Sequence, residues 1–352
     1  MAQSCDRIVY GLRNSGCIVH IFHFTSHGDP FKTDTLVNGT YTAIPVSENE
    51  AHISNLCWNF INRLSLPFTK LVCFGGYLPL IMGPVFARWL DIPLITLFRG
   101  NDFDASLFNP RRKSLVDDVL LNSMVVGCVT RDQVQKIIKL YPRLDLRYTP
   151  NGIDPEGWKA LPSEEKFAGE WRHSRLEGRM AVGMFGQLKE KKGLEVLLSC
   201  FRKPAIASRC FLLLAGEYGD SLESSLRELN IHFELLPFLD RNELVKYYSA
   251  CDVVVIPSHY EGMPNVLLEA GALGKPVIAS AVGGMKDILS EVDDSLLFYP
   301  GDIDGLETIL LRFAGMQPAE ISGVGQKLKQ HIVTHYNSQQ ELKPYVELFC
   351  GL

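Results

Sequence analysis

The sequence has no strong excess of charge of either sign. Lys and Arg number 35 and Asp and Glu number 40 among 352 residues, which gives a formal net charge of -5 at pH 7. A chain with this balance has no general attraction to nucleic acid or to an anionic membrane surface. We therefore expect no nucleic-acid partner.

Long apolar runs and a cysteine framework are also missing. No stretch of ~20 apolar residues could span a bilayer, and the first residues lack the pattern of a signal peptide. The nine cysteines are odd in number and none are spaced CxxC. This favours reduced thiols over a disulfide framework or a zinc site. Together these absences indicate a cytoplasmic protein.

The length and the 46% hydrophobic content suit two domains of ordinary size. Short apolar runs alternate with helical patterns in both halves, which predicts two domains with parallel sheets. A polar segment that ends near Gly178 separates them. We place the domains at 1–160 and 161–334, followed by a C-terminal segment at 335–352.

The first half begins unusually for this class of fold. Its first interpretable segment, Arg7–Asn14, has a helical pattern, and a strand from Cys17 to Phe22 follows. A doubly wound domain normally opens on a strand and a glycine-rich turn. Residues 23–49 form a polar stretch before the helix expected at Glu50–Leu64.

The stretch Ser258–Ala270 carries the strongest functional signal. It follows Val253–Ile256, a short β-branched run typical of a buried strand, and leads into a helix expected to begin at Pro264. No side chain caps that helix, so its first N–H groups are available to an anion. Glu261 lies in the loop and Glu269 about a turn and a half into the helix.

These two glutamates have an ordinary explanation and a functional one. Acidic residues near a helix start complement the helix dipole on any surface helix. This helix, however, is apolar on nearly all sides, and a buried glutamate needs a partner. Phosphate on the N–H groups and sugar hydroxyls on a carboxylate would describe a nucleotide sugar. We favour the functional explanation.

Two further loops follow buried strands. Gly186–Gly193 combines glycines, lysines and a helix start, which suits a diphosphate, although a solvated Lys/Glu run looks similar. In the second loop, Arg99 could hold a phosphate and Asp102 a sugar hydroxyl. Asp102 and Asn101 could equally cap a turn, and both interpretations stay open.

Taken together, these residues resemble the retaining glycosyltransferases of family GT4. The resemblance implies the GT-B fold, an α/β architecture with two Rossmann-like parallel-sheet domains that face a cleft. The match runs over nearly the whole chain and is strongest from Gly183 to Pro300. It rests on Glu261 and Glu269 in the setting Tyr-Glu-Gly-Met-Pro-Asn-Val-Leu-Leu-Glu-Ala, and on Pro150–Asp154, Gly274–Val277 and Gly283-Gly284.

The resemblance also implies roles for individual residues. Glu269 would bind the ribose hydroxyls, and Lys192 would neutralise the diphosphate. Glu261, Arg99 and Asp102 form the implied catalytic group. The implied donor-binding residues are Gly186, Gln187, Lys192, Gly262, Met263, Pro264, Asn265 and Glu269. The segment 335–352 is expected to pack back on the first domain.

The sequence departs from the family in two places. The family often has Arg at the position of Gln187, so Lys189 or Lys192 must carry more of the phosphate contact. The family's first strand and its Gly-Gly loop would lie before Met1. That strand is a central one, so its absence would expose the edges of its neighbours.

The implied reaction moves a sugar from a nucleoside-diphosphate sugar to a glycan, lipid-linked or polysaccharide hydroxyl, with retention at the anomeric carbon. No metal or other cofactor is expected, although Asp102 and Asp104, like Asp302 and Asp304, share the spacing of a two-carboxylate metal site. The alternatives are a catalytically impaired donor-binding relative and a nucleotide-sugar epimerase. A peripheral contact with the inner face of the membrane stays open, although no strong basic amphipathic helix argues for it.

Overall fold

The computed structural model describes residues 2–26, 31–46, 49–100 and 102–350. The chain divides into two compact units, one made of Met1–Asn151 with Ser338–Leu352 and the other of Gly152–Asn337. The sequence placed these limits at 160 and 334, whereas this division places them at 151 and 337. Both units are α/β with parallel strands, which is the predicted fold class.

The second unit contains one parallel sheet with strand order β10-β9-β8-β11-β12-β13. The chain proceeds from β8 toward one edge and then returns to β11, on the other side of β8. The switch point of the sheet therefore lies between β8 and β11, where α/β proteins bind ligands at the carboxyl ends of the strands. The strands are β8 Met180–Gln187, β9 Cys210–Glu217, β10 Phe233–Leu236, β11 Val253–Ile256, β12 Val277–Ser280 and β13 Leu297–Phe298.

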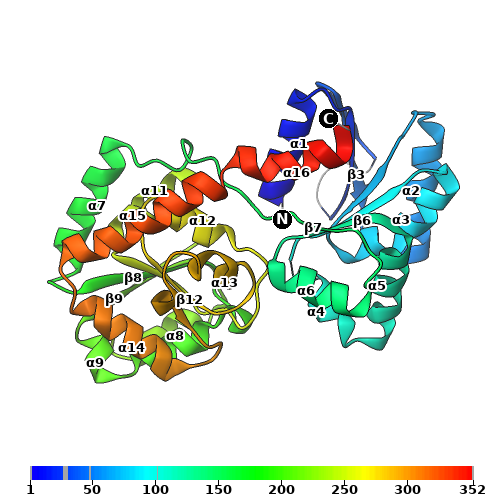
Figure 1. Ribbon diagram of the computed structural model, residues 1–352. Coiled ribbons are helices and arrows are strands. Elements are labelled where there is room, and N and C mark those ends of the chain that lie inside the picture. The colour runs from blue at the N-terminus through cyan, green and yellow to red at the C-terminus, as the bar shows by residue number, and fades with distance from the viewer. Residues whose placement is uncertain (1, 27–30, 47–48, 101, 351–352) are drawn as a thin grey trace. The chain divides into compact units, whose positions relative to one another are not determined.

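Helices cover both faces of this sheet, as Figure 1 shows. On one face α8 (Leu194–Phe201) and α9 (Pro204–Ala207) pack with α14 (Ile303–Ala314). The other face carries the pairs α7 with α11 and α12 with α15. The bounds of these four helices, and of α10 and α13, are α7 Pro162–Arg175, α10 Leu222–Glu228, α11 Arg241–Ala250, α12 Asn265–Ala272, α13 Gly283–Leu289 and α15 Pro318–His335. Helix α7 occupies part of the polar segment that the sequence indicated as a domain boundary.

The strands of the first unit form two sheets. One has the order β1-β3-β2, with β1 parallel and β2 antiparallel to β3, and the other has the parallel order β4-β5-β6-β7. Strands β2 and β3 lie in the stretch for which the sequence indicated only polar residues. The bounds are β1 Val19–Thr25, β2 Thr33–Leu36, β3 Gly39–Pro45, β4 Leu71–Phe74, β5 Leu94–Phe98, β6 Ser123–Cys128 and β7 Leu146–Tyr148.

The two sheets share their helices and their cores. One core cluster joins Phe22 of β1 to Leu71 of β4 through residues of α2 and α3, and another joins Val19 of β1 to Phe74 of β4 through α1 and α16. The helices of this unit are α1 Ala2–Asn14, α2 Glu50–Arg63, α3 Tyr77–Leu90, α4 Asp102–Leu107, α5 Pro110–Asn122, α6 Arg131–Leu140 and α16 Ser338–Cys350. Helix α16, which belongs to the C-terminal segment, packs on α1 through the Arg7–Glu341 ion pair at 2.9 Å.

No hydrogen bond joins β1 to β4 in the described part of this unit. The N–H of Val19 donates to the carbonyl oxygen of Asn38, just before β3. Successive residues of a strand point their backbone N–H and C=O groups to opposite sides, so those of Phe22 and Phe24 point away from β3. On β4 the N–H of Leu71 bonds toward β5, so the backbone of Val72 faces the opposite way.

The cysteines do not all stay free thiols, contrary to the expectation from the sequence. Cys17, which precedes β1, forms a disulfide with Cys350 at the end of α16, with 6.1 Å between their Cα atoms. The two residues are separated by 333 positions. No local spacing pattern could therefore have indicated the bond. Among the described residues, no helix is long and apolar enough to cross a membrane.

Candidate nucleotide-sugar site

The loop after β8 is shaped by two glycines with positive φ. Gly186 has a φ of 102° and Gly193 a φ of 74°, a region that side chains other than glycine rarely adopt. A Cβ at Gly193 would also lie 1.8 Å from the carbonyl oxygen of Pro257. Only glycine therefore lets this loop approach the loop after β11. The approach brings the single 3₁₀ turn Glu190–Lys192 to the carboxyl end of β11.

Lys192 and Glu261 meet where these loops converge. The ammonium of Lys192 forms an ion pair and a hydrogen bond with the Oε1 of Glu261, and the Ser258 hydroxyl donates to the same oxygen at 3.2 Å. The two charged side chains are 26% and 13% exposed, so solvent screens the pair only in part. The structure thus brings together a cation and an anion that the sequence placed 69 positions apart.

The loop Glu261–Met263 rests on the start of α13. The Gly262 carbonyl accepts the N–H of Gly284 at 2.7 Å. A Cβ at Gly284 would lie 2.8 Å from the Cβ of Met263, so the contact leaves no room for a side chain. This support fixes the backbone just ahead of α12.

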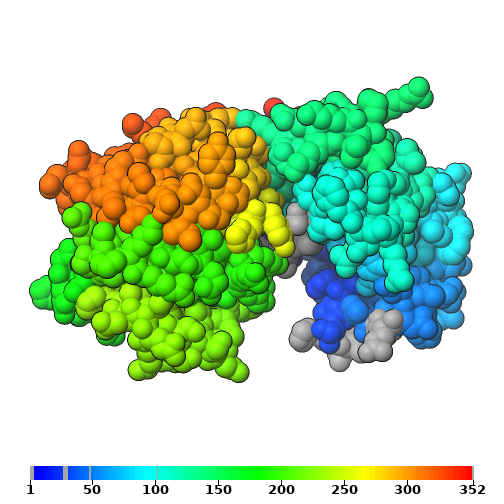
Figure 2. Space-filling view, turned by 90° about the horizontal axis from the view of Figure 1, so that it is seen from below, coloured from blue at the N-terminus to red at the C-terminus, as the bar shows by residue number. Residues whose placement is uncertain are grey.

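Helix α12 begins at Asn265, one residue later than the sequence indicated. Pro264 is its N-cap residue, in an extended conformation, and makes no side-chain cap. The helix start therefore has no side-chain cap from Pro264, which is an arrangement that suits an anionic group. Figure 2 shows the yellow segment around residue 260 at the surface of this unit.

Glu269 lies deeper on the same helix and is 6% exposed. Its Oε2 accepts a hydrogen bond of 2.9 Å from the hydroxyl of Tyr248 on α11. Burial, and then the negative charge of Glu269, raise the pKa of Tyr248 well above its ordinary value. The sequence did not indicate Tyr248, because a tyrosine on the inner face of a helix has the pattern of a core residue.

Gln187 takes a different partner from the one the family comparison suggested. Its side-chain amide donates to the carboxylate of Glu217 at 3.2 Å, and the Lys189 ammonium lies 3.8 Å from the same carboxylate. Glu217 ends β9, next to β8 in the sheet. In this arrangement Lys192 and the helix N-terminus, rather than Gln187, supply the positive potential at the switch point.

In the first unit, Arg99 is a buried structural residue. Its guanidinium donates to the carbonyl oxygen of Thr149 at 2.8 Å and to the side chains of Tyr345 and Asn151, and it lies 3.9 Å from the carboxylate of Glu341. The side chains of Arg99 and Glu341 are each 1% exposed. This geometry favours a role in holding α16 to the sheet over the phosphate contact expected from the sequence.

Asp102 begins α4 at the carboxyl end of β5. Its carboxyl group accepts backbone hydrogen bonds from Gly76 and Arg99, while Oδ2 is buried without a hydrogen-bond partner. Burial raises the pKa of Asp102 above its ordinary value, against the lowering effect of those two bonds. The structure therefore places an incompletely satisfied carboxyl group beside Gly75-Gly76. Asn101 lies outside the described residues.

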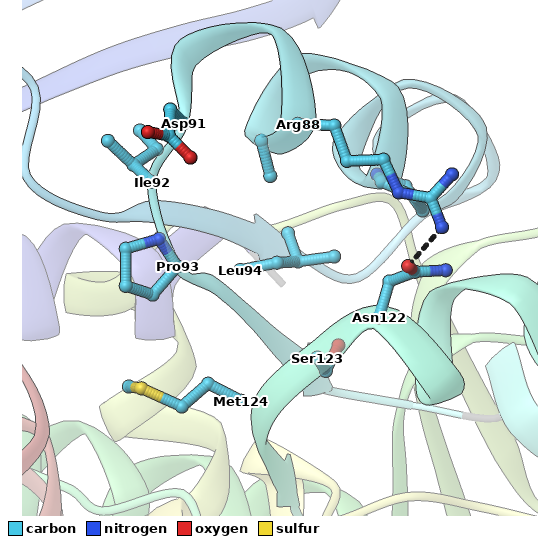
Figure 3. Close-up of a pocket in the computed structure, with 10 residues that line it drawn as sticks. Arg88, Asp91, Ile92, Pro93, Leu94, Asn122, Ser123 and Met124 are labelled. Carbon is cyan, nitrogen blue, oxygen red and sulfur yellow. Dashed lines mark hydrogen bonds between the residues drawn. The ribbon is translucent and has the colours of Figure 1, made fainter.

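A cavity of about 470 Å³ in the first unit lies away from these residues. It is lined by Arg88, Asp91 and the first residues of β5 and β6, and Figure 3 shows the Arg88 side chain bonded to Asn122 at its rim. These are the amino ends of the strands, whereas α/β proteins bind their ligands at the carboxyl ends. We therefore do not include the cavity in the candidate site.

The fold of the chain is shared with solved structures. The structure of sucrose-phosphate synthase from Thermosynechococcus elongatus superimposes with a TM-score of 0.81 at 19% identity, over 97% of this chain and 92% of that one. This similarity, together with the two α/β units, identifies the GT-B glycosyltransferase fold that the sequence predicted.

The sequence similarity to known families lies mainly in the second unit. Residues 170–318 match the model of the glycosyl transferases group 1 family. An uncharacterized glycosyltransferase of Methanocaldococcus jannaschii is 32% identical over 193 residues, which cover 52% of this chain and 49% of that protein. The UDP-Gal:alpha-D-GlcNAc-diphosphoundecaprenol alpha-1,3-galactosyltransferase of Escherichia coli is 26% identical over 294 residues, or 77% of this chain and 73% of the relative. The second unit is therefore similar to the group 1 glycosyl transferases and to GT4-like relatives, and the chain spans about half the length of several curated relatives that it matches.

Proposed function

We propose that the chain transfers a sugar from a nucleoside-diphosphate sugar to a hydroxyl group of a glycan, lipid-linked or polysaccharide acceptor, with retention at the anomeric carbon. The observation that carries the proposal is the grouping of Lys192, the uncapped N-terminus of α12 and the buried Glu269 beside the switch point of one sheet. A cation and helix N–H groups suit a diphosphate, and a carboxylate suits the ribose hydroxyls.

The residues have separate parts in the proposed reaction. Negative charge develops on the leaving diphosphate, and Lys192 with the N–H groups at the start of α12 would stabilise it. Glu261 would lie beside the donor sugar, held by Lys192 and Ser258. Asp102, whose Oδ2 lacks a partner, would accept a hydrogen bond from a sugar hydroxyl. On this account lysine and backbone dipoles do the work for which other transferases use a metal.

The E. coli relative supports one choice of donor and acceptor. Its name specifies UDP-Gal as donor and a sugar on diphosphoundecaprenol as acceptor. By analogy, we propose a UDP-sugar as the first donor to test and a lipid-linked glycan as the first acceptor. A protein that uses such an acceptor would work at the inner face of the membrane.

The first experiment is a thermal-shift panel of UDP, GDP and ADP and their common sugars, run beside Glu269→Ala. A ligand at a hundredfold excess over its Kd stabilises the folded chain by about 2.7 kcal/mol. We expect one nucleotide to raise the melting temperature of the wild-type chain and not of the variant. If no nucleotide shifts the wild-type chain, the proposal is wrong for this chain.

The unpaired edges of β1 and β4 favour a second candidate, a relative that binds the donor but does not turn it over. Turnover assays separate the two. Release of UDP that depends on added acceptor supports the transferase, whereas binding without turnover supports the impaired relative. Conversion of the donor sugar without any acceptor would instead indicate an epimerase.

A further inference from the structure

The side chain of Tyr248 contacts the Glu269 carboxylate from the interior of the second unit. Tyr248 is 0% exposed, and its hydroxyl donates to Oε2 of Glu269 at 2.9 Å. A buried tyrosine hydroxyl costs free energy unless it finds a partner. The sequence separation of 21 residues shows that tertiary packing alone creates this contact.

The position of the Tyr248 hydroxyl is fixed by the rings around it. The Tyr248 ring lies 4.2 Å from the ring of Phe185 on β8, centroid to centroid, and 6.0 Å from the ring of Trp158. Aromatic pairs at these separations favour defined geometries. The ring therefore has little freedom to move its hydroxyl away from Glu269.

The hydroxyl keeps its proton under ordinary conditions. Burial first, and the charge of Glu269 second, raise the pKa of Tyr248 well above its ordinary value. Because only the protonated phenol can donate to the carboxylate, the raised pKa keeps Tyr248 a donor to Glu269 at neutral pH.

We propose that Tyr248 is a positioning residue whose hydroxyl holds the Glu269 carboxylate in the orientation that accepts hydrogen bonds from the ribose of the donor. The proposal rests on the ribose-binding role of Glu269 in the proposed function. A purely structural role is the competing explanation: Tyr248 would then only satisfy a buried glutamate. The two explanations differ in what they predict for nucleotides that lack ribose hydroxyls.

The test compares UDP with 2′,3′-dideoxy-UDP by isothermal titration calorimetry on the wild-type chain and on Tyr248→Phe. Phenylalanine keeps both ring contacts and removes only the hydroxyl. A hydrogen bond to a charged group contributes enough to change a Kd by about tenfold. We expect Tyr248→Phe to raise the Kd for UDP by about tenfold and to leave the Kd for the dideoxy nucleotide unchanged.

Tyr247→Phe is the matched control. Tyr247 is the neighbouring residue on α11, and its ring packs against Phe167 at 5.4 Å, away from Glu269. The same substitution there should leave both Kd values unchanged. A second check combines Tyr248→Phe with Glu269→Ala. If the tyrosine acts through the glutamate, its loss has no further effect on UDP binding in the Glu269→Ala background.

The outcomes are distinguishable. Equal weakening of UDP and dideoxy-UDP by Tyr248→Phe, or no change in either, overturns the positioning role while the proposed function stands. An additive loss of UDP affinity in the double variant also overturns it. A wild-type chain that binds none of UDP, GDP and ADP overturns the proposed function itself, and that result is obtained without any variant.

Discussion

The ammonium of Lys192 is paired with the carboxylate of Glu261, and this pair joins the loops that follow β8 and β11. Those two strands are neighbours at the switch point of the sheet. A diphosphate at the start of α12 would compete with Glu261 for the ammonium. On the proposed function, the strength of that pair would influence both donor affinity and the charge available to the leaving group.

The first prediction concerns Lys192. Removing one donor that stabilises charge in a transition state lowers kcat by about 10²–10³. We expect Lys192→Ala to lose turnover of the donor sugar in that range, measured by release of nucleoside diphosphate under saturating acceptor. Lys189→Ala is the control, because Lys189 is 53% exposed and lies near Glu217. Equal losses in the two variants would contradict a specific role for Lys192.

The second prediction separates affinity from turnover at Glu261. Glu261→Gln keeps the side-chain shape but removes the charge that pairs with Lys192. A partly exposed ion pair contributes up to about 1 kcal/mol, which corresponds to about a fivefold change in a dissociation constant. We expect nucleoside diphosphate to bind up to about fivefold tighter to the variant, while sugar transfer slows. Weaker binding of the diphosphate would show that the pair does not compete with it.

The candidate site could be predicted from sequence where one short segment carries the chemistry. Glu261, Glu269 and the uncapped start of α12 lie within Ser258–Ala270, so local spacing was sufficient. Tyr248 was missed because its partner lies on another helix, and its sequence context is that of an ordinary core residue. Local spacing gave no sign of this contact, whereas the resemblance did imply that 335–352 packs on the first unit, as α16 does.

Arg99 and the first sheet illustrate the same limit. An arginine after a buried strand suggested a phosphate contact, but its partner Glu341 is supplied by α16, more than two hundred residues later. Strand β2 was missed because it consists of Thr33–Leu36, which are all exposed, so no apolar alternation marks it. The parallel sheet of the second unit was predictable because its strands are buried on both faces and consist of continuous apolar runs.

The third prediction tests the structural role of Arg99. Removing a buried donor leaves each of its acceptors unsatisfied at a cost of about 1–3 kcal/mol, and Arg99 donates to Thr149, Tyr345 and Asn151, whereas Glu341 keeps its pair with Arg7. We expect Arg99→Ala to lower the free energy of unfolding by about 3 kcal/mol in urea denaturation. Arg147→Ala is the control in the same unit, because it removes only an exposed ion pair with Asp145 at 2.8 Å. This variant should change the free energy of unfolding by less than about 0.5 kcal/mol. Unchanged stability with weaker donor binding would instead support the phosphate contact.

The fourth prediction follows from the raised pKa of Asp102. Burial makes the folded chain hold this proton more tightly than the unfolded chain does. The protonated Asp102 side chain therefore contributes to the free energy of unfolding fully at a pH below the pKa of the unfolded chain. This contribution is lost as the pH rises through the pKa of the folded chain. Asp102→Asn removes this dependence, so the variant should gain stability relative to wild type over that window and keep the gain at neutral pH.

The measurement for Asp102 is urea denaturation of both chains from acid to neutral pH. Asp118→Asn is a suitable control, because Asp118 lies on the exposed side of α5 and bonds only to Asn122 in the described structure. A stability difference between wild type and Asp102→Asn that stays constant with pH would contradict a raised pKa. A loss of stability at neutral pH would show that the ionised carboxylate is the preferred form.

The last prediction concerns the facing edges of β1 and β4. The N–H groups of Phe22 and Phe24 point away from β3, whereas those of Ile21 and His23 point toward it. Amides without a hydrogen-bond partner exchange with solvent far faster than paired ones in the same element. We therefore expect Phe22 and Phe24 to exchange clearly faster than Ile21 and His23 by NMR-detected hydrogen exchange. Because the four amides belong to one strand, unfolding of the strand as a whole would affect them equally. Equal protection of all four would mean that β1 is paired on both edges, and the division of the first unit into two sheets would then be wrong.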